Sequence, residues 1–348
     1  MDIALIVLTG SLITFTVLSL VHNQYWIFRI FDFPRLQKFF LSLLTLGLII
    51  IFFKGDATIK WILAAALMLN VGYLSVQIFP FTVFAKKQVL AAGSDLPEQS
   101  VSVMIANVFQ DNTNVTGCLR EIADNCPDIV LLLETNSRWD NATRELEKTY
   151  PHYLRIPLEN TYGMLLYSKL QLKDPTVRYL VESDIPSIHT DVVLRSQQKV
   201  HFIALHPTPP VPNENPRSTE RDKELLLAAE MVKKCKDPVI VIGDLNDVAW
   251  SYTTELFLKM SALLDPRRGR GFYNTFHAHN VFMRFPLDHA FISTDFKLKS
   301  MRRLKNFNSD HFPMFIHLQY ETQADDQQEP LHPDKADLEN AAEKKAAT

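Results

Sequence analysis

The stretch Pro238-Val-Ile-Val-Ile-Gly-Asp-Leu-Asn-Asp247 is the strongest local signal in the chain. Its four β-branched residues, Val239 to Ile242, predict a strand buried on both faces. Asp244 and Asn246 follow at once and are too polar to continue such a strand. The sequence therefore predicts a carboxylate and an amide at the rim of a core. A turn without further function is the alternative, because glycine, aspartate and asparagine favour turns in any protein.

Several other apolar runs also end in polar side chains. The pattern predicts strands over residues 102–106, 128–133, 162–167, 192–194, 200–205 and 314–318, and helices over residues 115–125, 218–235 and 253–260. Eight polar residues stand at the ends or edges of apolar runs: Asn107, Glu134, His206, Asp244, Asn246, Asp288, Asp310 and His311. Strand ends meet at one rim of a layered sheet protein, so we expect these side chains to share a site.

The residue types in this set favour a hard divalent cation. Carboxylate and amide oxygens suit Mg²⁺ or Mn²⁺, which keep bound waters and bind substrate phosphates. Zinc is disfavoured because the sequence has no clustered cysteines or closely spaced histidine ligands.

Three apolar runs, residues 3–21, 39–53 and 59–79, occupy the N-terminal part of the chain. The first is long enough to cross a bilayer and lacks the basic segment and cleavage site of a secretory signal. We therefore predict that residues 1–90 are a membrane anchor with about three transmembrane helices. Buried helices of a soluble domain are the alternative, disfavoured because the runs leave no polar face for water.

With three spans, the N-terminus and the large domain lie on opposite sides of the membrane. The side of the large domain carries five basic residues, Arg29, Arg35, Lys38, Lys86 and Lys87. The other side carries Lys54, Lys60 and the α-amine. This count favours a multi-pass protein of the cell membrane with a cytoplasmic domain. A wrongly counted second span would invert the orientation.

The remaining chain divides by composition. Residues 91–100 contain glycine, proline and polar side chains and predict a linker. Residues 101–320 carry 26 basic and 26 acidic side chains and form the predicted catalytic domain. Residues 321–348 carry eight acidic against three basic side chains. This composition predicts a disordered acidic tail.

Six motifs follow apolar runs: Ala-Asn107-Val, Leu-Leu-Glu134-Thr, His206-Pro-Thr, Gly-Asp244-Leu-Asn246, Leu-Asp288-His and Ser309-Asp310-His311. In this order they resemble the endonuclease/exonuclease/phosphatase (DNase I-like) superfamily over residues 100 to 320, here in a membrane-anchored bacterial form. The resemblance implies an α/β fold: a four-layer sandwich of two facing mixed β-sheets flanked by helices, preceded by transmembrane helices.

The same resemblance implies a role for each polar residue. Asn107 and Glu134 would hold the catalytic Mg²⁺ or Mn²⁺, with Asp310 near it. Asp244 and Asn246 would position the attacking water and a phosphate oxygen. The remaining catalytic roles fall to three residues: His311 as base or charge stabiliser, Asp288 to orient it, and His206 as donor to a phosphate or leaving-group oxygen. One departure is Phe109, where the abasic-site branch carries an acidic residue.

Four arginines near Asp288 are candidate substrate-binding residues: Arg267, Arg268, Arg270 and Arg284. Arginine forks bind phosphate well, although such clusters also occur as solvated or lipid-facing surfaces. The balanced charge of residues 101–320 counts against a general DNA binder, which usually carries a basic footprint.

We predict a metal-dependent phosphoesterase that hydrolyses a phosphodiester in the manner of a nuclease. A phosphatase or pyrophosphatase acting on a lipid-linked phosphate is the first alternative, and a catalytically idle binding module is the second. The expected partners are thus a phosphate-ester substrate, either nucleic acid or lipid-linked, and the lipid bilayer. Nothing in the sequence indicates an obligate protein partner.

Overall fold

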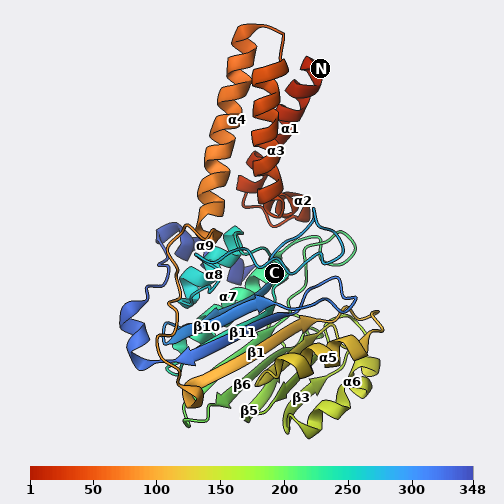
Figure 1. Cartoon of the computed structure of the whole chain (residues 1–348), viewed down its shortest axis with the longest axis vertical. Coiled ribbons are helices and arrows are strands. Elements are labelled where there is room, and N and C mark those ends of the chain that lie inside the picture. Colours follow the sequence, from red (N-terminus) through yellow and green to blue (C-terminus); the bar gives the residue numbers. More distant parts are fainter. Residues whose placement is uncertain (348) are drawn as a thin grey trace.

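The computed structural model describes residues 1–347, in which a helical stalk stands on a β-sandwich (Figure 1). Three long helices form the stalk: α1 (Asp2–Leu20), α3 (Arg35–Phe52) and α4 (Ala57–Ile78). The short helix α2 (Trp26–Arg29) and a 3₁₀ helix (Ile30–Asp32) connect α1 to α3 at the base of the stalk. The three predicted apolar runs are therefore three helices.

The stalk helices are long and apolar enough to cross a membrane. α1 buries Leu5, Thr9 and Leu12 against its neighbours, a spacing of three or four residues that keeps them on one helix face. Asn70 of α4 donates a hydrogen bond to Ser42 of α3 at 3.0 Å. A polar contact of this kind joins helices where apolar burial alone gives little preference.

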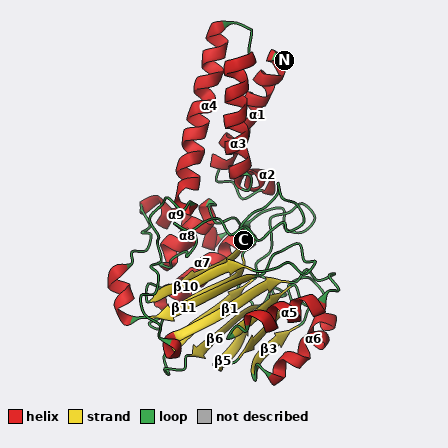
Figure 2. Ribbon diagram, in the orientation of Figure 1, coloured by secondary structure: helices red, strands yellow, loops and turns green. Residues whose placement is uncertain are grey.

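Eleven strands form two sheets in the sandwich (Figure 2). The first sheet has the order β10-β11-β1-β2-β4-β3. Its strands are β1 (Ser100–Asn107), β2 (Ile129–Leu133), β3 (His152–Ile156), β4 (Met164–Ser168), β10 (Phe296–Arg303) and β11 (Met314–Tyr320). The second sheet has the order β5-β6-β7-β8-β9. Its strands are β5 (Gln171–Arg178), β6 (Ser187–Val193), β7 (Lys199–Leu205), β8 (Val239–Asp244) and β9 (Asp288–Ile292).

The main core lies between the two sheets. Val103 and Leu131 of the first sheet share one buried cluster with Phe202 and Ile240 of the second. Two helices, α5 (Val115–Asn125) and α6 (Ser137–Thr143), cover the outer face of the first sheet. Two others, α7 (Thr219–Lys234) and α8 (Tyr252–Ser261), cover the second. The predicted four-layer α/β sandwich is confirmed.

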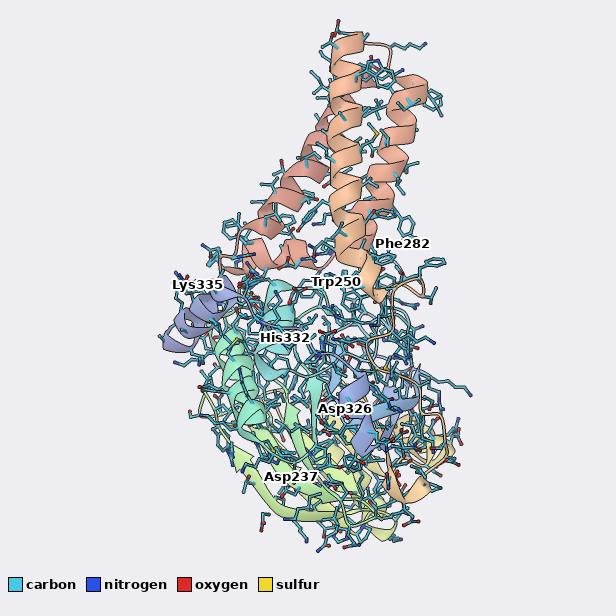
Figure 3. All side chains as sticks on the ribbon, turned by 90° about the vertical axis from the view of Figure 1, so that its left-hand side faces the viewer. Asp237, Trp250, Phe282, Asp326, His332 and Lys335 are labelled. Atoms are coloured by element: carbon cyan, nitrogen blue, oxygen red, sulfur yellow. The ribbon has the colours of Figure 1, made fainter. Side chains whose placement is uncertain are left out.

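The base of the stalk packs directly on the sandwich. Phe33 and Phe81 join an apolar cluster with Trp250 and Phe285. The Nε1 of Trp250 also donates a hydrogen bond to the carbonyl oxygen of Asp32 at 2.8 Å. Figure 3 shows Trp250 at the point where the stalk meets the sandwich. The stalk and the sandwich therefore share an apolar cluster.

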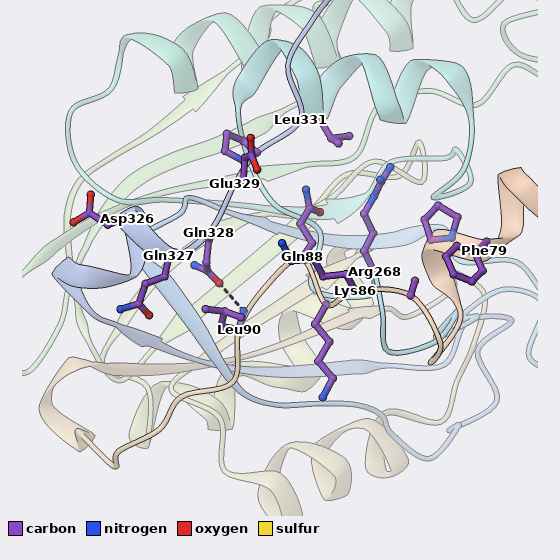
Figure 4. Close-up of a pocket in the computed structure, with 14 residues that line it drawn as sticks. Phe79, Lys86, Gln88, Leu90, Arg268, Asp326, Gln327, Gln328, Glu329 and Leu331 are labelled. Atoms are coloured by element: carbon purple, nitrogen blue, oxygen red, sulfur yellow. Dashed lines mark hydrogen bonds between the residues drawn. The ribbon is translucent and has the colours of Figure 1, made fainter.

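The connection from the stalk to the first strand is packed as well (Figure 4). Val89 is fully buried, and the backbone nitrogen of Leu90 donates to the side-chain oxygen of Gln328 at 2.6 Å. This connection and residues 326–331 border a cavity of about 720 Å³. None of the eight polar residues singled out by sequence lines that cavity, so it is not the predicted site.

The acidic C-terminal segment contradicts the prediction of disorder. Helix α9 (Lys335–Ala346) begins with a capping box at Asp334 and packs on α7 and α8, with Ala341 buried between them. Lys344 forms an ion pair with Asp222 of α7, in which both side chains are almost fully buried. The segment needs no core of its own because it packs on α7 and α8. Its amino-acid composition gives no indication of that packing surface.

We expect Lys344→Ala to lower the free energy of unfolding by about 1–3 kcal/mol, because it leaves the buried Asp222 short of a partner. Burial alone would raise the pKa of Asp222, but Lys344 and Arg221 outweigh burial and hold it below its usual range. The stabilisation is therefore present at neutral pH and is lost as the pH falls below about 4.

Thermal unfolding of the detergent-solubilised protein at several pH values measures this loss. Lys345→Ala is the matched control, because Lys345 pairs with the exposed Glu230 and should contribute only about 0–1 kcal/mol. Equal effects of the two substitutions at neutral pH would show that α9 does not depend on the buried pair.

Candidate active site

Strand direction brings the predicted polar residues to one rim of the sandwich. β1 runs parallel to β2, and β7 runs parallel to β8, so Asn107, Glu134, His206 and Asp244 each end or follow a strand. Asp288 opens the antiparallel strand β9 directly opposite Asp244. At the neighbouring residue, a Cβ on Gly243 would lie 1.8 Å from the carbonyl oxygen of Leu205. Only glycine allows β8 to approach β7 this closely, immediately before Asp244.

Asn107 connects the polar groups of the two sheets. Its side-chain nitrogen donates to Glu134 at 2.7 Å and to Asp244 at 3.1 Å. The backbone nitrogen of Phe109 donates to the side-chain oxygen of Asn107 at 3.0 Å, which sets the direction of the amide. The hydroxyl of Ser309 donates to the carbonyl oxygen of Asn107 at 2.7 Å and so ties the loop before β11 to the end of β1.

His311 lies between two carboxylates. Its Nδ1 is 2.8 Å from Asp288, and its Nε2 is 3.5 Å from Asp244. Burial alone would lower the pKa of His311, but the two carboxylates outweigh burial and raise the pKa to about 10. The ring is therefore cationic at neutral pH. Of the two expected roles, this geometry favours charge stabilisation and proton donation over general base.

The carboxylates of the site are buried, which disfavours their ionised form. Burial raises the pKa of Glu134 to about 7, although the hydrogen bond from Asn107 opposes this shift. Burial also raises the pKa of Asp244, against the attraction of His311. Glu134 has a φ of 57°, a left-handed backbone conformation that is uncommon for a residue other than glycine. Its side chain is thereby directed from the end of β2 into the site.

The donor set fits a divalent cation. Asp244, Asp288 and His311 have potential ligand atoms within 4.8 Å of one another. Both nitrogens of His311 face carboxylates, however, so these three residues are better described as a hydrogen-bonded group than as a ligand set. Glu134 and Asp310 offer further carboxylate oxygens beside this group, and only His311 offsets their charge. A hard cation near Glu134 and Asp310 would balance that charge.

Asn246 follows the same strand as Asp244 but points elsewhere. Its backbone nitrogen donates to Asp244 at 3.0 Å, and its side chain donates to the carbonyl oxygen of Pro207 at 2.9 Å. Asn246 has a φ of 50°, and the guanidinium of Arg221 donates to its carbonyl oxygen at 2.8 Å. The turn after β8 is therefore held at several points, and it orients Asp244.

His206 is buried beside the site, with its ring 5.2 Å from that of Tyr162. Burial lowers the pKa of His206 to about 4, so the ring is neutral at physiological pH. Its Nδ1 has no hydrogen-bond partner within residues 1–347, and the same holds for one carboxylate oxygen of Asp288. Buried polar atoms are normally paired, so these two atoms are candidates for contact with a substrate or a water.

A pocket of about 370 Å³ opens over these groups. Five of the predicted residues line it: Glu134, Asp244, Asn246, Asp310 and His311. The other three, Asn107, His206 and Asp288, are buried immediately behind them. All eight polar residues selected from the sequence thus meet at one place.

The predicted substrate-binding role of Arg267 is wrong. Its guanidinium is buried, donates to Asp265 at 2.9 Å and lies 2.6 Å from Nδ1 of His289. Protein groups around this guanidinium already occupy the positions at which a phosphate could bind. Sequence position alone does not distinguish such a structural ion pair from a phosphate ligand.

The other three arginines also lie outside the pocket that contains His311. Arg268 borders the cavity beside the connection between the stalk and β1, and Arg270 donates to the carbonyl oxygen of Val89 in that connection. Arg284 donates to the carbonyl oxygen of Ala278 at 3.1 Å. These contacts hold that connection and a surface loop, which corrects the expectation that the four arginines form a substrate-binding group.

The sequence analysis missed one wall of the pocket. Trp26, Ile30 and Phe33, from the segment between the first two stalk helices, line it together with the acidic groups. The loop Pro209–Pro212 contributes the adjoining side. The proline run after His206 was a visible signal for the loop. No local signal connects the stalk residues to a site formed more than 100 residues later.

The sandwich is similar to several solved structures of low sequence identity. The D. rerio TDP2 structure complexed with a single-strand DNA product has a TM-score of 0.51 and 15% identity, covering 63% of this chain and 99% of that one. An endonuclease/exonuclease/phosphatase from Bacteroides vulgatus has a TM-score of 0.52 and 17% identity, covering 64% and 99%. The human Nocturnin catalytic domain with bound sulfate has a TM-score of 0.51 and 18% identity, covering 65% and 96%.

These structural matches cover 63–65% of the chain and establish the fold. No curated protein sequence matches the chain. A family model does match residues 104–311, from within β1 to the histidine between the two carboxylates. Its members are hydrolases of phosphoester bonds and depend on divalent metals. The chain therefore belongs to the Endonuclease/Exonuclease/phosphatase family.

Proposed function

We propose that this protein is a membrane-anchored, divalent-metal-dependent phosphoesterase that hydrolyses its substrate by attack of water on phosphorus. The observation that carries the proposal is the group formed by Asp244 and His311, which line one pocket, and Asp288, which is buried behind His311. A protonated histidine held between two carboxylates, beside further free carboxylates, suits a reaction in which negative charge must be neutralised and a water placed.

Glu134 and Asp310 are the residues that would hold the cation. Asn107 turns its amide nitrogen toward Glu134 and Asp244, so it orients these carboxylates instead of offering an oxygen. When bound, Mg²⁺ or Mn²⁺ would supply charge neutralisation at the phosphoryl oxygens.

The remaining roles follow from charge and position. Asp244, whose carboxylate lies at the pocket floor, would accept a proton from the attacking water. His311 would stabilise the negative charge that develops on the phosphoryl group, and Asp288 would keep His311 protonated. His206 is neutral and would act as a hydrogen-bond donor or acceptor rather than as a cation.

A nuclease remains the second candidate. The solved TDP2 structure from D. rerio is described as complexed with single-strand DNA, and its sandwich is similar to this one. At 15% identity the similarity concerns the fold alone, so a nucleic-acid substrate rests on that protein and on the motif resemblance.

The cation requirement can be tested with the full chain in detergent and bis-p-nitrophenyl phosphate as substrate. We expect EDTA to abolish hydrolysis and Mg²⁺ or Mn²⁺ to restore it. Glu134→Gln should weaken Mn²⁺ binding, measured by calorimetry, and lower activity by roughly 10²-fold or more. Glu145→Gln, at an exposed acid outside the pocket, is the control. Full activity in EDTA would contradict the metal proposal, and no hydrolysis of any phosphoester under any condition would favour an idle module.

Asp288→Asn should lower kcat by about 10²- to 10⁴-fold with little change in KM, because Asp288 acts through His311 and does not line the pocket. The chain offers a matched control in Asp191→Asn. Asp191 pairs with His201 at 2.9 Å outside the pocket, so its substitution should leave both constants unchanged. Similar kinetics for the two variants would remove Asp288 from the mechanism.

We also propose that the stalk crosses the cell membrane with the sandwich in the cytoplasm, as the distribution of basic residues favours. The chain provides its own probe, because Cys126 is exposed on the sandwich while Cys118 is buried. A membrane-impermeant maleimide should label Cys126 only after cells are permeabilised. The labelling is read in a Cys235→Ser background, because Cys235 is only partly buried. In that background Cys126→Ser should abolish the labelling, and labelling of intact cells would reverse the orientation.

A further inference from the structure

Three apolar residues of the stalk base form part of the lining of the pocket. Trp26, Ile30 and Phe33 line the pocket together with Glu134 and His311. These three residues lie between the ends of α1 and α3, at the base of the stalk (Figure 1). If the stalk crosses a membrane, this wall stands at the membrane surface.

Backbone hydrogen bonds fix the wall to the sandwich. The nitrogen of Trp26 donates to the carbonyl oxygen of Pro216 at 2.9 Å. The nitrogen of Ser218 donates to the carbonyl oxygen of Gln24 at 2.8 Å, in the opposite direction. Tyr25 and Arg217, which lie between these donors and acceptors, form an antiparallel bridge. The segment that carries these apolar residues is therefore fixed to the sandwich by backbone hydrogen bonds.

The pocket offers no free cation to a polynucleotide. Arg29 is the only lysine or arginine among the residues described as lining it. Its guanidinium donates to the carbonyl oxygens of Asn23 and Val21 at 2.7 Å each and pairs with Asp32 at 3.4 Å. Proteins that follow a nucleic-acid strand use a basic groove and stacked aromatic rings. This pocket has aromatic and aliphatic side chains beside its polar groups, but no lysine or arginine free to follow a phosphate backbone.

Exposed apolar side chains continue from the pocket toward the stalk. Ile30 is 50% exposed and Val211 is 37% exposed, and both line the pocket. Phe282 is 84% exposed, and its carbonyl oxygen accepts a hydrogen bond from Gln37 of α3 at 2.7 Å. Figure 3 shows Phe282 beside the base of the stalk. Exposed apolar groups gathered around the end of a membrane helix suit the interface between lipid and water.

From these observations we infer that the site acts on the phosphate ester of a membrane amphiphile, whose apolar chain lies against Trp26, Ile30 and Phe33 while its phosphate faces His311. This inference rests on the proposed phosphoesterase function and specifies its substrate class. The oxygen of water bonds to phosphorus as Asp244 accepts a proton from that water. The P–O bond to the leaving group breaks, and the departing oxygen takes up a proton from solvent, so the products are an alcohol and the phosphate. No further reactant is required.

The test uses two probes with the same scissile bond. Methyl p-nitrophenyl phosphate and octyl p-nitrophenyl phosphate differ only in the alkyl chain, and each releases p-nitrophenolate. The full-length protein in nanodiscs is given each probe with Mg²⁺. Burial of three or four extra methylenes predicts a kcat/KM for the octyl ester about 50-fold or more above that of the methyl ester.

Two neighbouring isoleucines supply the matched variants. Ile30→Ser should lower the octyl-to-methyl ratio by about tenfold or more, because Ile30 lines the pocket. Ile27→Ser should retain the ratio and the activity, because Ile27 is 45% exposed on the same segment and does not line the pocket. Val211→Ser, in the proline loop, is the second pocket variant should Ile30→Ser fail to fold.

The outcomes separate this inference from the proposed function. Equal rates for the two esters would overturn the amphiphile inference while leaving the phosphoesterase intact. Faster cleavage of plasmid DNA than of the octyl ester would overturn it in favour of a nuclease. Failure to hydrolyse either ester or DNA would overturn both proposals. Nanodiscs containing dioleoyl phosphatidic acid or farnesyl phosphate, assayed for phosphate release, then distinguish a glycerolipid from an isoprenoid source.

Discussion

The parallel pairing of β1 with β2 and of β7 with β8 determines where the chemistry lies. In each pair the two strands end side by side. The two sheets face each other across one core. Polar residues that follow the strands therefore meet at a single rim. The hydrogen bond from the amide of Asn107 in the first sheet to the carboxylate of Asp244 in the second joins the two sheets at this rim. Antiparallel pairing at these positions would carry the same residues to opposite ends of the sandwich.

This arrangement concentrates negative charge where water is scarce. Burial raises the pKa values of Glu134 and Asp244, which means that folding works against their ionisation. His311 offsets part of this cost, and the two carboxylates around it in turn keep it protonated. The remaining imbalance is the physical reason to expect a cation. The group draws on both sheets, because Asp244 and Asp288 belong to β8 and β9 while His311 comes from the loop before β11.

The sequence predicted the centre of the fold better than its edges. The helix expected over residues 115–125 has those bounds, and the central strands β1, β2, β7, β8 and β11 all lie where apolar runs predicted them. The strands outside the predicted ranges, β3, β5, β9 and β10, all lie at sheet edges. β5 contains Pro175 and a register shift between Lys173 and Thr176, and β10 carries Lys297 and Lys299. Edge strands tolerate proline, bulges and charge, which conceal the apolar alternation that marks a strand.

Local sequence patterns likewise predicted some parts of the site and not others. Catalytic groups at strand ends carry a local signature, because a polar residue interrupts an apolar run. The wall formed by Trp26, Ile30 and Phe33 has no such signature, because apolar residues near a membrane helix are ordinary. Its position depends on tertiary contacts between the stalk and the sandwich.

Those contacts give the stalk a structural role next to the site. Asp32 is buried between Arg29 and Arg35, and its carbonyl oxygen accepts the bond from Trp250. Trp250 packs in turn with Leu287, the residue before Asp288. Removal of the stalk would leave the indole nitrogen unpaired and this apolar cluster open to water, next to the residue that orients His311. The stalk helices and the Asp244–His311–Asp288 group are therefore coupled through one continuous core, and the base of the stalk supplies part of the pocket lining.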